Sequence, residues 1–285
     1  MRVGAHVSTA GGVGKAIDRA KEIGAEAIQV FCSSPQGWTF KPLSQEHTSA
    51  FRTRAFQEGI GPNFLHGIYL VNVGSQNREN LNKGIQSLIN YMHVAQEIGA
   101  AGVIFHAGSH KGVGFDRILR QAVESMRRVL DNSPDDVWLI IENSAGMGHH
   151  VGAKFSEISR LIMELGDPRV KVCLDTQHCF AAGYDLSDKH ALEAAMDEFD
   201  REIGFSNLVA VHANDSKVEL GSGVDRHQNL GQGYIGLEGF EAIMAHRAFR
   251  DVPFLLEVPG FAGTGPDKTS VDILKSIRER IGLSG

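Results

Sequence analysis

Hydrophobic and polar positions follow one repeating pattern along the chain: a short apolar run, then a longer stretch with the periodicity of an amphipathic helix. Gly102 to His106, GVIFH, and Leu208 to His212, LVAVH, have the length and β-branched content of buried strands. Several helical stretches end at glycine, as in KEIGA at 21–25 and QEIGA at 96–100, because glycine readily adopts the left-handed conformation that ends a helix. The pattern predicts eight strands and eight helices.

The predicted strands and helices alternate over almost the whole chain. We expect strands at 1–7, 25–31, 63–66, 102–106, 137–142, 170–174, 208–212 and 253–257, and helices at 14–23, 45–58, 78–98, 115–130, 154–165, 189–203, 237–245 and 269–281. Strict alternation implies a parallel sheet, and eight repeats imply closure into a (β/α)8 TIM barrel. The predicted fold is therefore an α/β barrel, with residues 1–285 as a single catalytic domain. A doubly wound open sheet is the structural alternative, but no dinucleotide fingerprint follows the first strand.

Composition narrows the class of protein. With 42% hydrophobic residues in 285 positions, the chain can bury a large core. We find no apolar run of membrane-spanning length and no signal peptide, so we expect a cytoplasmic protein without a membrane partner. The three cysteines, Cys32, Cys173 and Cys179, have no paired spacing and are expected to be buried thiols. The formal charge of −6 argues against a generally basic nucleic-acid binder.

The candidate chemistry stands where the strands end. The last six predicted strands each finish in a residue type that binds metals, and the strand at 170–174 adds a histidine three positions after its acid. The residues are His66, His106, Glu142, Asp175 with His178, His212 and Glu257. Any one of them could be a hydrogen-bonded core histidine or a helix-capping acid. In a barrel, however, all these ends lie on one rim, where such enzymes build their active sites. We therefore expect the residues to converge.

A further pair lies in the loop after the seventh strand. Asp225 and His227 are two residues apart, so both side chains share one face if the segment is extended. With His178, the pair could hold a third ion. Five histidines and four carboxylates suit zinc, with manganese or iron as alternatives. Three divalent ions would add six positive charges and so cancel the formal charge of −6 on the chain.

Six segments stand out along the chain: GAHVSTAGG at 4–12, FHAGSH at 105–110, IENSAGMG at 141–148, CLDTQHCFAAGYD at 173–185, HANDSK at 212–217 and VDRHQNLGQGYIG at 224–236. Together they resemble endonuclease IV, the apurinic/apyrimidinic endonuclease family of base excision repair. The resemblance implies a metal-dependent endonuclease that hydrolyses the phosphodiester 5′ to an abasic site in duplex DNA and leaves a 3′-hydroxyl and a 5′-deoxyribose phosphate. It also implies three zinc ions and substrates with abasic sites or blocked 3′ ends.

The resemblance assigns a role to each of the nine residues. His66, His106 and Glu142 would hold the first zinc, and Glu142 would bridge to a second that Asp175, His212 and Glu257 complete. The third zinc would lie between His178, Asp225 and His227. Two close metals lower the pKa of a bridging water and supply hydroxide. No side-chain nucleophile and no organic cofactor is then needed, and we expect a monomer.

DNA recognition is where the sequence departs from the family. The family usually has an arginine two residues before a tryptophan in the loop after the second strand, and here Gln36 takes that place before Trp38. A glutamine carries no charge and stacks less well than a guanidinium. Tyr69 and Leu70 resemble the family's residues at the damaged nucleotide, where an apolar wedge can hold unstacked DNA. Ordinary packing under the third loop is the alternative for both.

Two further expectations concern side chains outside this set. His6 and His110 lie near the rim and are expected to support the ligands by hydrogen bonds. Histidines on predicted helices are expected to be solvated and methionines at helical spacing to be in the core: His47, His93, His190 and His246, and Met126, Met163 and Met196.

The main alternative function is a divalent-metal sugar isomerase or epimerase. Barrels of related design hold one ion with a set like Glu142, Asp175, His212 and Glu257. That function leaves the other five candidate ligands without a role. A metal-storing or DNA-binding module without turnover is the non-enzymatic alternative.

Overall fold

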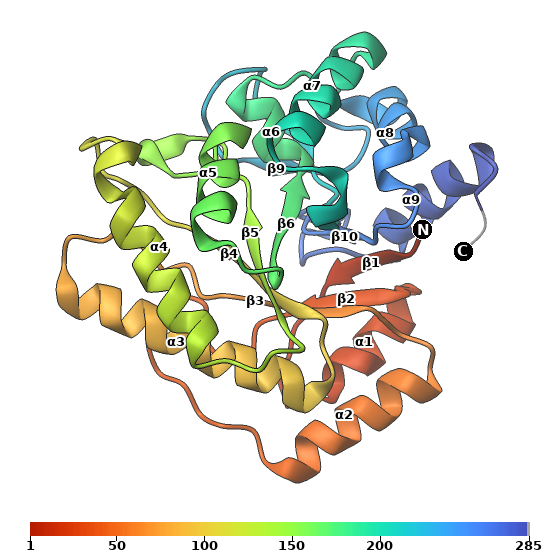
Figure 1. Cartoon of the computed structure of the whole chain (residues 1–285). Helices are drawn as coiled ribbons and strands as arrows, with labels where there is room; N and C mark the ends of the chain where they lie inside the picture. The colour runs from red at the N-terminus through yellow and green to blue at the C-terminus, as the bar shows by residue number, and fades with distance from the viewer. Residues whose placement is uncertain (284–285) are drawn as a thin grey trace.

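Eight parallel strands close into a barrel with the helices outside it (Figure 1). The computed structural model describes residues 1–283. Around the barrel the strands follow the order β1-β10-β7-β6-β5-β4-β3-β2. Their bounds are β1 Val3–His6, β2 Ala27–Val30, β3 Asn63–His66, β4 Gly102–His106, β5 Trp138–Glu142, β6 Val170–Asp175, β7 Leu208–His212 and β10 Phe254–Leu256. The predicted (β/α)8 fold is confirmed.

Helices fill the intervals between strands and in most places begin and end where the sequence predicts. The α-helices are α1 Lys15–Ile23, α2 Gln45–Gln57, α3 Arg78–Ile98, α4 Phe115–Asp131, α5 Phe155–Leu165, α6 Thr176–Ala182, α7 Lys189–Glu202, α8 Gly236–Ala245 and α9 Lys268–Arg280. Short 3-10 turns are η1 Met147–His149, η2 Phe205–Asn207 and η3 Arg247–Phe249. Gly24 and Gly99 end α1 and α3 in the left-handed conformation, with φ of 75° and 71°, as the glycine pattern predicts.

Three elements near the predicted rim do not appear in the sequence pattern. Helix α6 starts directly at the end of β6 and has only seven residues, too few to show a helical periodicity. Strands β8 Asp215–Ser216 and β9 His227–Gln228 pair as a small antiparallel ribbon, with Ser216 opposite His227. Two-residue strands carry no alternation that a sequence can reveal. All three elements carry or adjoin candidate ligands.

Side chains that point into the barrel form two layers. The lower layer is apolar and consists of Ala27, Phe64, Ile104, Ile140, Cys173, Ala210 and Leu255, with Gly4 at the same level of β1. Because side chains alternate along a strand, the residue two positions further on also points inward. That second layer is polar on every strand: His6, Gln29, His66, His106, Glu142, Asp175, His212 and Glu257. The barrel thus has an apolar plug below a polar layer at its carboxyl end.

Helix α9 returns to the first strand and fastens the two ends of the described chain together. Arg278 lies against Glu26 with two Nη to Oε distances of 2.7 and 3.0 Å, and it donates to the Met1 carbonyl at 2.9 Å. Glu26 also accepts from the Val3 backbone N–H at 2.9 Å. Burial raises the pKa of Glu26, but Arg278, the Val3 N–H and Lys275 lower it by more. This carboxylate therefore links β1, β2 and α9.

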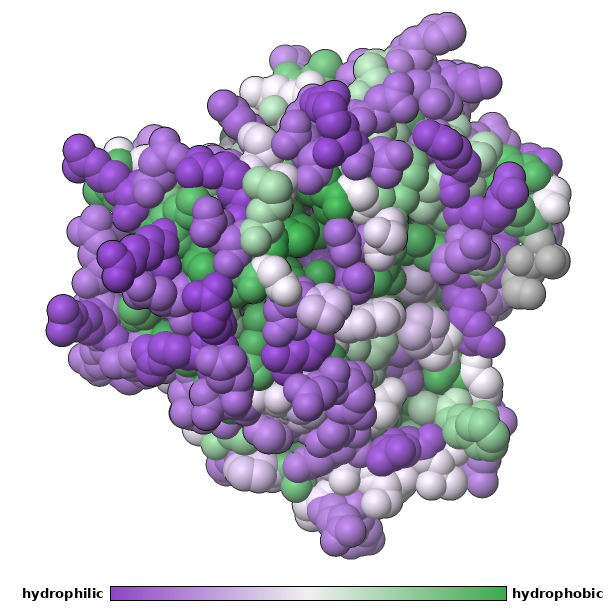
Figure 2. Space-filling model, viewed as in Figure 1, coloured by the Kyte–Doolittle hydropathy of each residue, from purple (hydrophilic) through white to green (hydrophobic). Residues whose placement is uncertain are grey.

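Of the methionines and helix histidines placed from the sequence pattern, Met163 and His246 do not lie where it predicts. Hydrophilic residues dominate the face in Figure 2, and hydrophobic ones show between them. Met126 and Met196 are buried as expected, but Met163 is 69% exposed, because it lies about 200° around α5 from buried Leu161. His246 is also buried, since it follows the end of α8 and turns back to accept from the Ala248 N–H.

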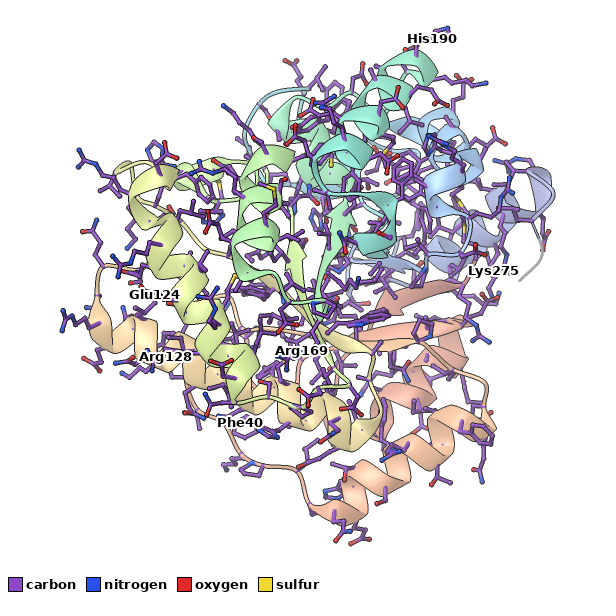
Figure 3. All side chains as sticks on the ribbon, in the orientation of Figure 1. Phe40, Glu124, Arg128, Arg169, His190 and Lys275 are labelled. Carbon is purple, nitrogen blue, oxygen red and sulfur yellow. The ribbon has the colours of Figure 1, made fainter. Side chains whose placement is uncertain are left out.

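The other three helix histidines, His47, His93 and His190, are exposed. His190 points outward from α7 in Figure 3. Within residues 1–283, no helix combines the length and the apolar character that crossing a membrane requires.

Candidate metal centre

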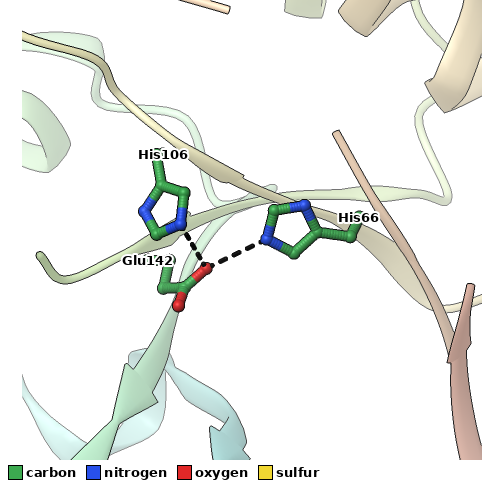
Figure 4. A group of neighbouring side chains, drawn as sticks. All are labelled: His66, His106 and Glu142. Atoms are coloured by element: carbon green, nitrogen blue, oxygen red, sulfur yellow. Dashed lines mark hydrogen bonds and ion pairs between the residues drawn. The ribbon is translucent and has the colours of Figure 1, made fainter. Parts of the chain in front are cut away.

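The first group of candidate ligands comes from three neighbouring strands. His66, His106 and Glu142 end β3, β4 and β5, and Figure 4 shows both rings directed at one carboxylate oxygen. Glu142 Oε2 lies 3.2 Å from His66 Nε2 and 3.4 Å from His106 Nε2. His66 Nδ1 donates to the Gly67 carbonyl at 2.7 Å, which leaves the lone pair of Nε2 directed into the site. The predicted convergence of these strands is present.

A second group shares Glu142 with the first. Glu142, Asp175, His212 and Glu257 place ligand atoms within 4.8 Å of one another. His212 Nδ1 lies 2.9 Å from Glu142 Oε1 and 3.3 Å from Glu257 Oε2. Glu142 therefore directs Oε2 at the first group and Oε1 at the second. This is the arrangement of a carboxylate that can bridge two ions.

A third group joins α6 to the β8–β9 ribbon. His178 Nε2 lies 3.4 Å from Asp225 Oδ2, and His227 Nε2 lies 3.5 Å from Asp225 Oδ1 and 3.6 Å from Asp175 Oδ2. Asp175 also caps α6 by accepting from the His178 backbone N–H at 2.8 Å. The i, i+2 pair thus faces His178, as its spacing predicts. Asp175 faces this group as well as the second, a contact that sequence spacing does not indicate.

Burial and mutual charge shift the pKa values of these groups in opposite directions. Burial raises the pKa of Glu142, but the rings of His106 and His212 lower it by more, so it lies well below its usual range. Burial raises the pKa of Asp175, and the negative charge of Glu142 raises it further. For His178, burial lowers the pKa, but Asp175 and other carboxylates raise it well above its usual range. Bound cations would replace protons in balancing these acids.

The donor set fits divalent metals. His227 Nε2 is buried and, among residues 1–283, has no hydrogen-bond partner. It nevertheless points at two carboxylate oxygens that are 3.5 and 3.6 Å away, beyond hydrogen-bond reach. A cation between them would satisfy the nitrogen and both oxygens. Imidazole with carboxylate is the donor chemistry of zinc, and also of manganese or iron.

Two asparagines that the sequence did not single out position the ligands. The Asn143 side-chain oxygen accepts from the Asp175 backbone N–H at 2.6 Å, and the Asn143 backbone carbonyl lies 3.0 Å from His178 Nδ1. Asn214 donates to Asp175 Oδ2 at 2.7 Å and accepts from the Glu257 N–H at 2.9 Å. Each stands one or two residues after a ligand, and that adjacency is the signal that could have found them.

Of the two rim histidines, His6 supports a ligand only indirectly, through Gln29, which bonds to Glu257, and the expectation for His110 is wrong. His6 Nδ1 lies 2.9 Å from the Gln29 amide nitrogen and 3.5 Å from Glu257. His110 Nδ1 instead accepts from the N–H groups of Gly112 and Gly114 in its own loop. Its strand has already ended, so local backbone donors are nearer than the ligands.

Two cavities adjoin the centre, and Tyr69 lines both. One of about 530 Å³ contains His106, His178 and Asp225, and one of about 480 Å³ contains His6, His227 and Glu257. Tyr69 is 60% exposed and Leu70 39% exposed, so close packing under the loop does not account for them. Exposed Gln36 follows Pro35, whose carbonyl accepts from the Tyr69 N–H at 3.0 Å. The two loops are therefore connected beside the centre.

Comparison with known proteins shows which family the chain belongs to. A family model described as a xylose isomerase-like TIM barrel matches residues 17–280. A protein of Halothermothrix orenii named "Probable endonuclease 4" is 37% identical over 276 residues, which is 96% of this chain and 99% of the relative. The chain belongs to the endonuclease IV family. A Campylobacter hominis protein with the same name is 39% identical over 260 residues, 90% of this chain and 92% of the relative.

Solved structures extend the comparison. The crystal structure of endonuclease IV from Thermus thermophilus superimposes with a TM-score of 0.86 at 34% identity and covers 98% of this chain and 100% of that chain. A D-tagatose 3-epimerase-like protein reaches a TM-score of 0.74 at 16% identity, covering 99% and 98%. The second likeness concerns the fold alone.

Proposed function

We propose that this endonuclease IV family member is a metal-dependent DNA repair enzyme. It hydrolyses the phosphodiester 5′ to an abasic site in duplex DNA, leaves a 3′-hydroxyl and a 5′-deoxyribose phosphate, and acts in base excision repair. Duplexes with blocked 3′ ends are further substrates. The observation that carries the proposal is the meeting of five imidazoles and four carboxylates, in three overlapping groups, at the carboxyl end of one barrel.

The residues would divide among three zinc ions as their contacts divide them. His66, His106 and Glu142 would hold the first ion. Glu142 would also contribute its other oxygen to a second ion, which Asp175, His212 and Glu257 complete. His178, Asp225 and His227 would hold the third ion, with Asp175 facing it. Divalent ions at such a centre activate water and neutralise charge on phosphate oxygens. Manganese or iron could take the same places.

The protein's own side chains would orient the DNA and keep the ligands in position. Asn143 holds the backbone N–H of Asp175 and Asn214 holds its carboxylate, so the carboxylate oxygens stay directed at the second and third ligand groups. Tyr69, exposed beside both cavities, and Leu70, exposed beside the larger one, would occupy the gap at the missing base. Gln36 would contact the same strand from the adjoining loop. The expectations of a monomer and of a cytoplasmic location stay predictions.

The sugar isomerase or epimerase remains the second candidate, because the four-residue group of Glu142, Asp175, His212 and Glu257 exists as a compact unit. Such an enzyme needs one ion. It gives no role to His66, His106, His178, Asp225 and His227, which lie against the same unit. We therefore rank the nuclease first.

One assay tests the function. A duplex with a single synthetic abasic site is incubated with protein of measured metal content, with and without a strong chelator, beside an undamaged duplex. We expect a nick 5′ to the lesion, a new end that a polymerase can extend, about three ions per chain, and loss of cleavage with chelator. A fully metallated sample that leaves the damaged duplex intact overturns the proposal, and one ion per chain with sugar turnover supports the isomerase.

A further inference from the structure

Gln29 on β2 is a fully buried amide that contacts the second ligand group. It stands two residues after Ala27, at the level where each of the six ligand-bearing strands presents an acid or a histidine. A polar residue at this depth must satisfy all of its hydrogen-bonding groups. Its three contacts show how it does so.

The carboxylate of Glu257 fixes the orientation of the Gln29 amide. Gln29 Nε2 lies 2.6 Å from Glu257 Oε1 and 2.9 Å from His6 Nδ1. A carboxylate accepts hydrogen bonds and repels another oxygen, so the NH2 end must face Glu257. The amide's two N–H groups are then used, one by Glu257 and one by His6. Its carbonyl oxygen faces the opposite way.

That carbonyl in turn fixes the protonation of His212. Gln29 Oε1 lies 2.8 Å from His212 Nε2, and a carbonyl can only accept. Nε2 therefore carries a proton, and in the neutral ring the lone pair is on Nδ1. Nδ1 is the atom that faces Glu142 Oε1 at 2.9 Å and Glu257 Oε2 at 3.3 Å. Without a metal ion, Nδ1 can approach these carboxylates so closely only by carrying a second proton and donating it. A bound cation would take the place of that proton.

The other well-buried ligand rings have the opposite polarity. His66 and His178 direct Nδ1 at the backbone carbonyls of Gly67 and Asn143. Their Nε2 atoms lie 3.2 Å from Glu142 and 3.4 Å from Asp225, although His178 Nδ1 also lies 3.3 Å from Glu142. Gln29 reaches His212 Nε2 from β2 and gives this ring the reverse polarity. In the barrel order β2 lies three strands from β7, with β1 and β10 between them.

We propose that Gln29 is a positioning residue that makes Nδ1 the metal-binding nitrogen of His212 and holds Glu257 Oε2 free for the same ion. The inference rests on the proposed metal centre and goes beyond its ligand set, because it assigns the binding atom and the residue that selects it. Partners of this kind typically change metal affinity 10- to 100-fold when removed.

The wild-type protein loaded with zinc gives the first test, by long-range ¹H–¹⁵N NMR of its imidazoles. We expect His212 to show a zinc-bound Nδ1 and a protonated Nε2, while His66 and His178 show the reverse in the same spectrum. This measurement requires no variant and no catalytic turnover. Zinc on His212 Nε2 overturns the inference while leaving the metal centre in place. No zinc uptake at all contradicts the proposed function instead.

A variant pair gives the second test. Gln29→Met keeps the buried volume but cannot accept from Nε2, and we expect zinc affinity at the four-residue group to fall about 10- to 100-fold in competition with a chelator. Asn63→Ser is the matched control, because Asn63 is a buried amide on β3 that donates to Ile60 and touches no ligand. Unchanged affinity and an unchanged His212 spectrum in folded Gln29→Met would show that Gln29 only fills space.

Discussion

Replacing Asp215 by asparagine should loosen residues 231–236, the segment that follows the candidate ligands Asp225 and His227, although Asp215 itself contacts neither of these ligands. Asp215 is fully buried in β8 and accepts from five backbone N–H groups at 2.8 to 3.3 Å, those of Ser216, Gly231, Gly233, Ile235 and Gly236. No lysine or arginine within the described part of the chain forms a salt bridge with it. Its charge is balanced by backbone dipoles of the loop that follows β9.

The magnitude follows from counting acceptors. An amide keeps one acceptor oxygen, so its NH2 must face either Gly231 and Gly233 or Ser216 and Ile235 at 2.8 to 3.0 Å. Each hydrogen bond to a charged group contributes about 1.5–3 kcal/mol net. The glycine pair is nearer to solvent, where water can replace part of the loss. We therefore expect a local cost of about 2–4 kcal/mol for Asp215→Asn.

The assay combines amide hydrogen exchange with metal binding. Faster exchange is expected at Gly231, Gly233 and Ile235. If ion binding had to restore the order of this segment, the whole cost of about 2–4 kcal/mol would be subtracted from the binding free energy. Affinity for the ion between His178, Asp225 and His227 would then fall by roughly 30- to 1000-fold. Asp188→Asn is the control, because Asp188 is an exposed helix cap whose role asparagine also fills.

Two outcomes would refute this reasoning. Unchanged amide exchange at Gly231 and Gly233 would show that the Asp215 carboxylate does not hold the loop. Faster exchange with unchanged affinity would show that the loop does not hold Asp225 and His227. Either result can be read without a cleavage assay.

Three further predictions concern other parts of the molecule. His227→Ala should lower metal content by about one ion and depress cleavage far more than stability, measured by elemental analysis and nicking beside exposed His190→Ala; unchanged turnover would reject the third site. Gln36→Arg should tighten binding to abasic duplex and steepen its salt dependence, and equal affinity at every ionic strength would show that this loop does not touch DNA. Glu26→Gln should lower the free energy of unfolding by about 1–3 kcal/mol at neutral pH. Since the folded pKa of Glu26 is lowered, that stability is present above the unfolded pKa of about 4.3 and lost as pH falls; a pH-independent difference in denaturant titrations would contradict the role of Arg278.

The order of elements and the rim residues could be predicted because both depend on local pattern. Strands such as Gly102–His106 and Leu208–His212 have the predicted bounds, since a buried parallel strand shows as a continuous apolar run. Once closure into a barrel is inferred, every strand end lies on one rim. His66 and His212 could therefore be expected to meet although 146 positions separate them.

Positions at element ends were less predictable. Met163 and His246 were placed wrongly because the buried face of α5 and the end of α8 depend on what each helix packs against. Asp215 and the ribbon it belongs to were missed for a related reason. Two-residue strands exist only through their partner, and the sequence shows no period over so short a length.

The sequence by itself determined which side chains point into the barrel, because the two-residue period of a strand is a local property. It thereby determined the polar layer, including Gln29, which follows the same spacing as the ligands. Only the tertiary structure decided which atom of each side chain faces which neighbour. Those contacts depend on the register between strands and on loops that return from distant positions, so Asp175 faces two groups and His212 presents Nδ1.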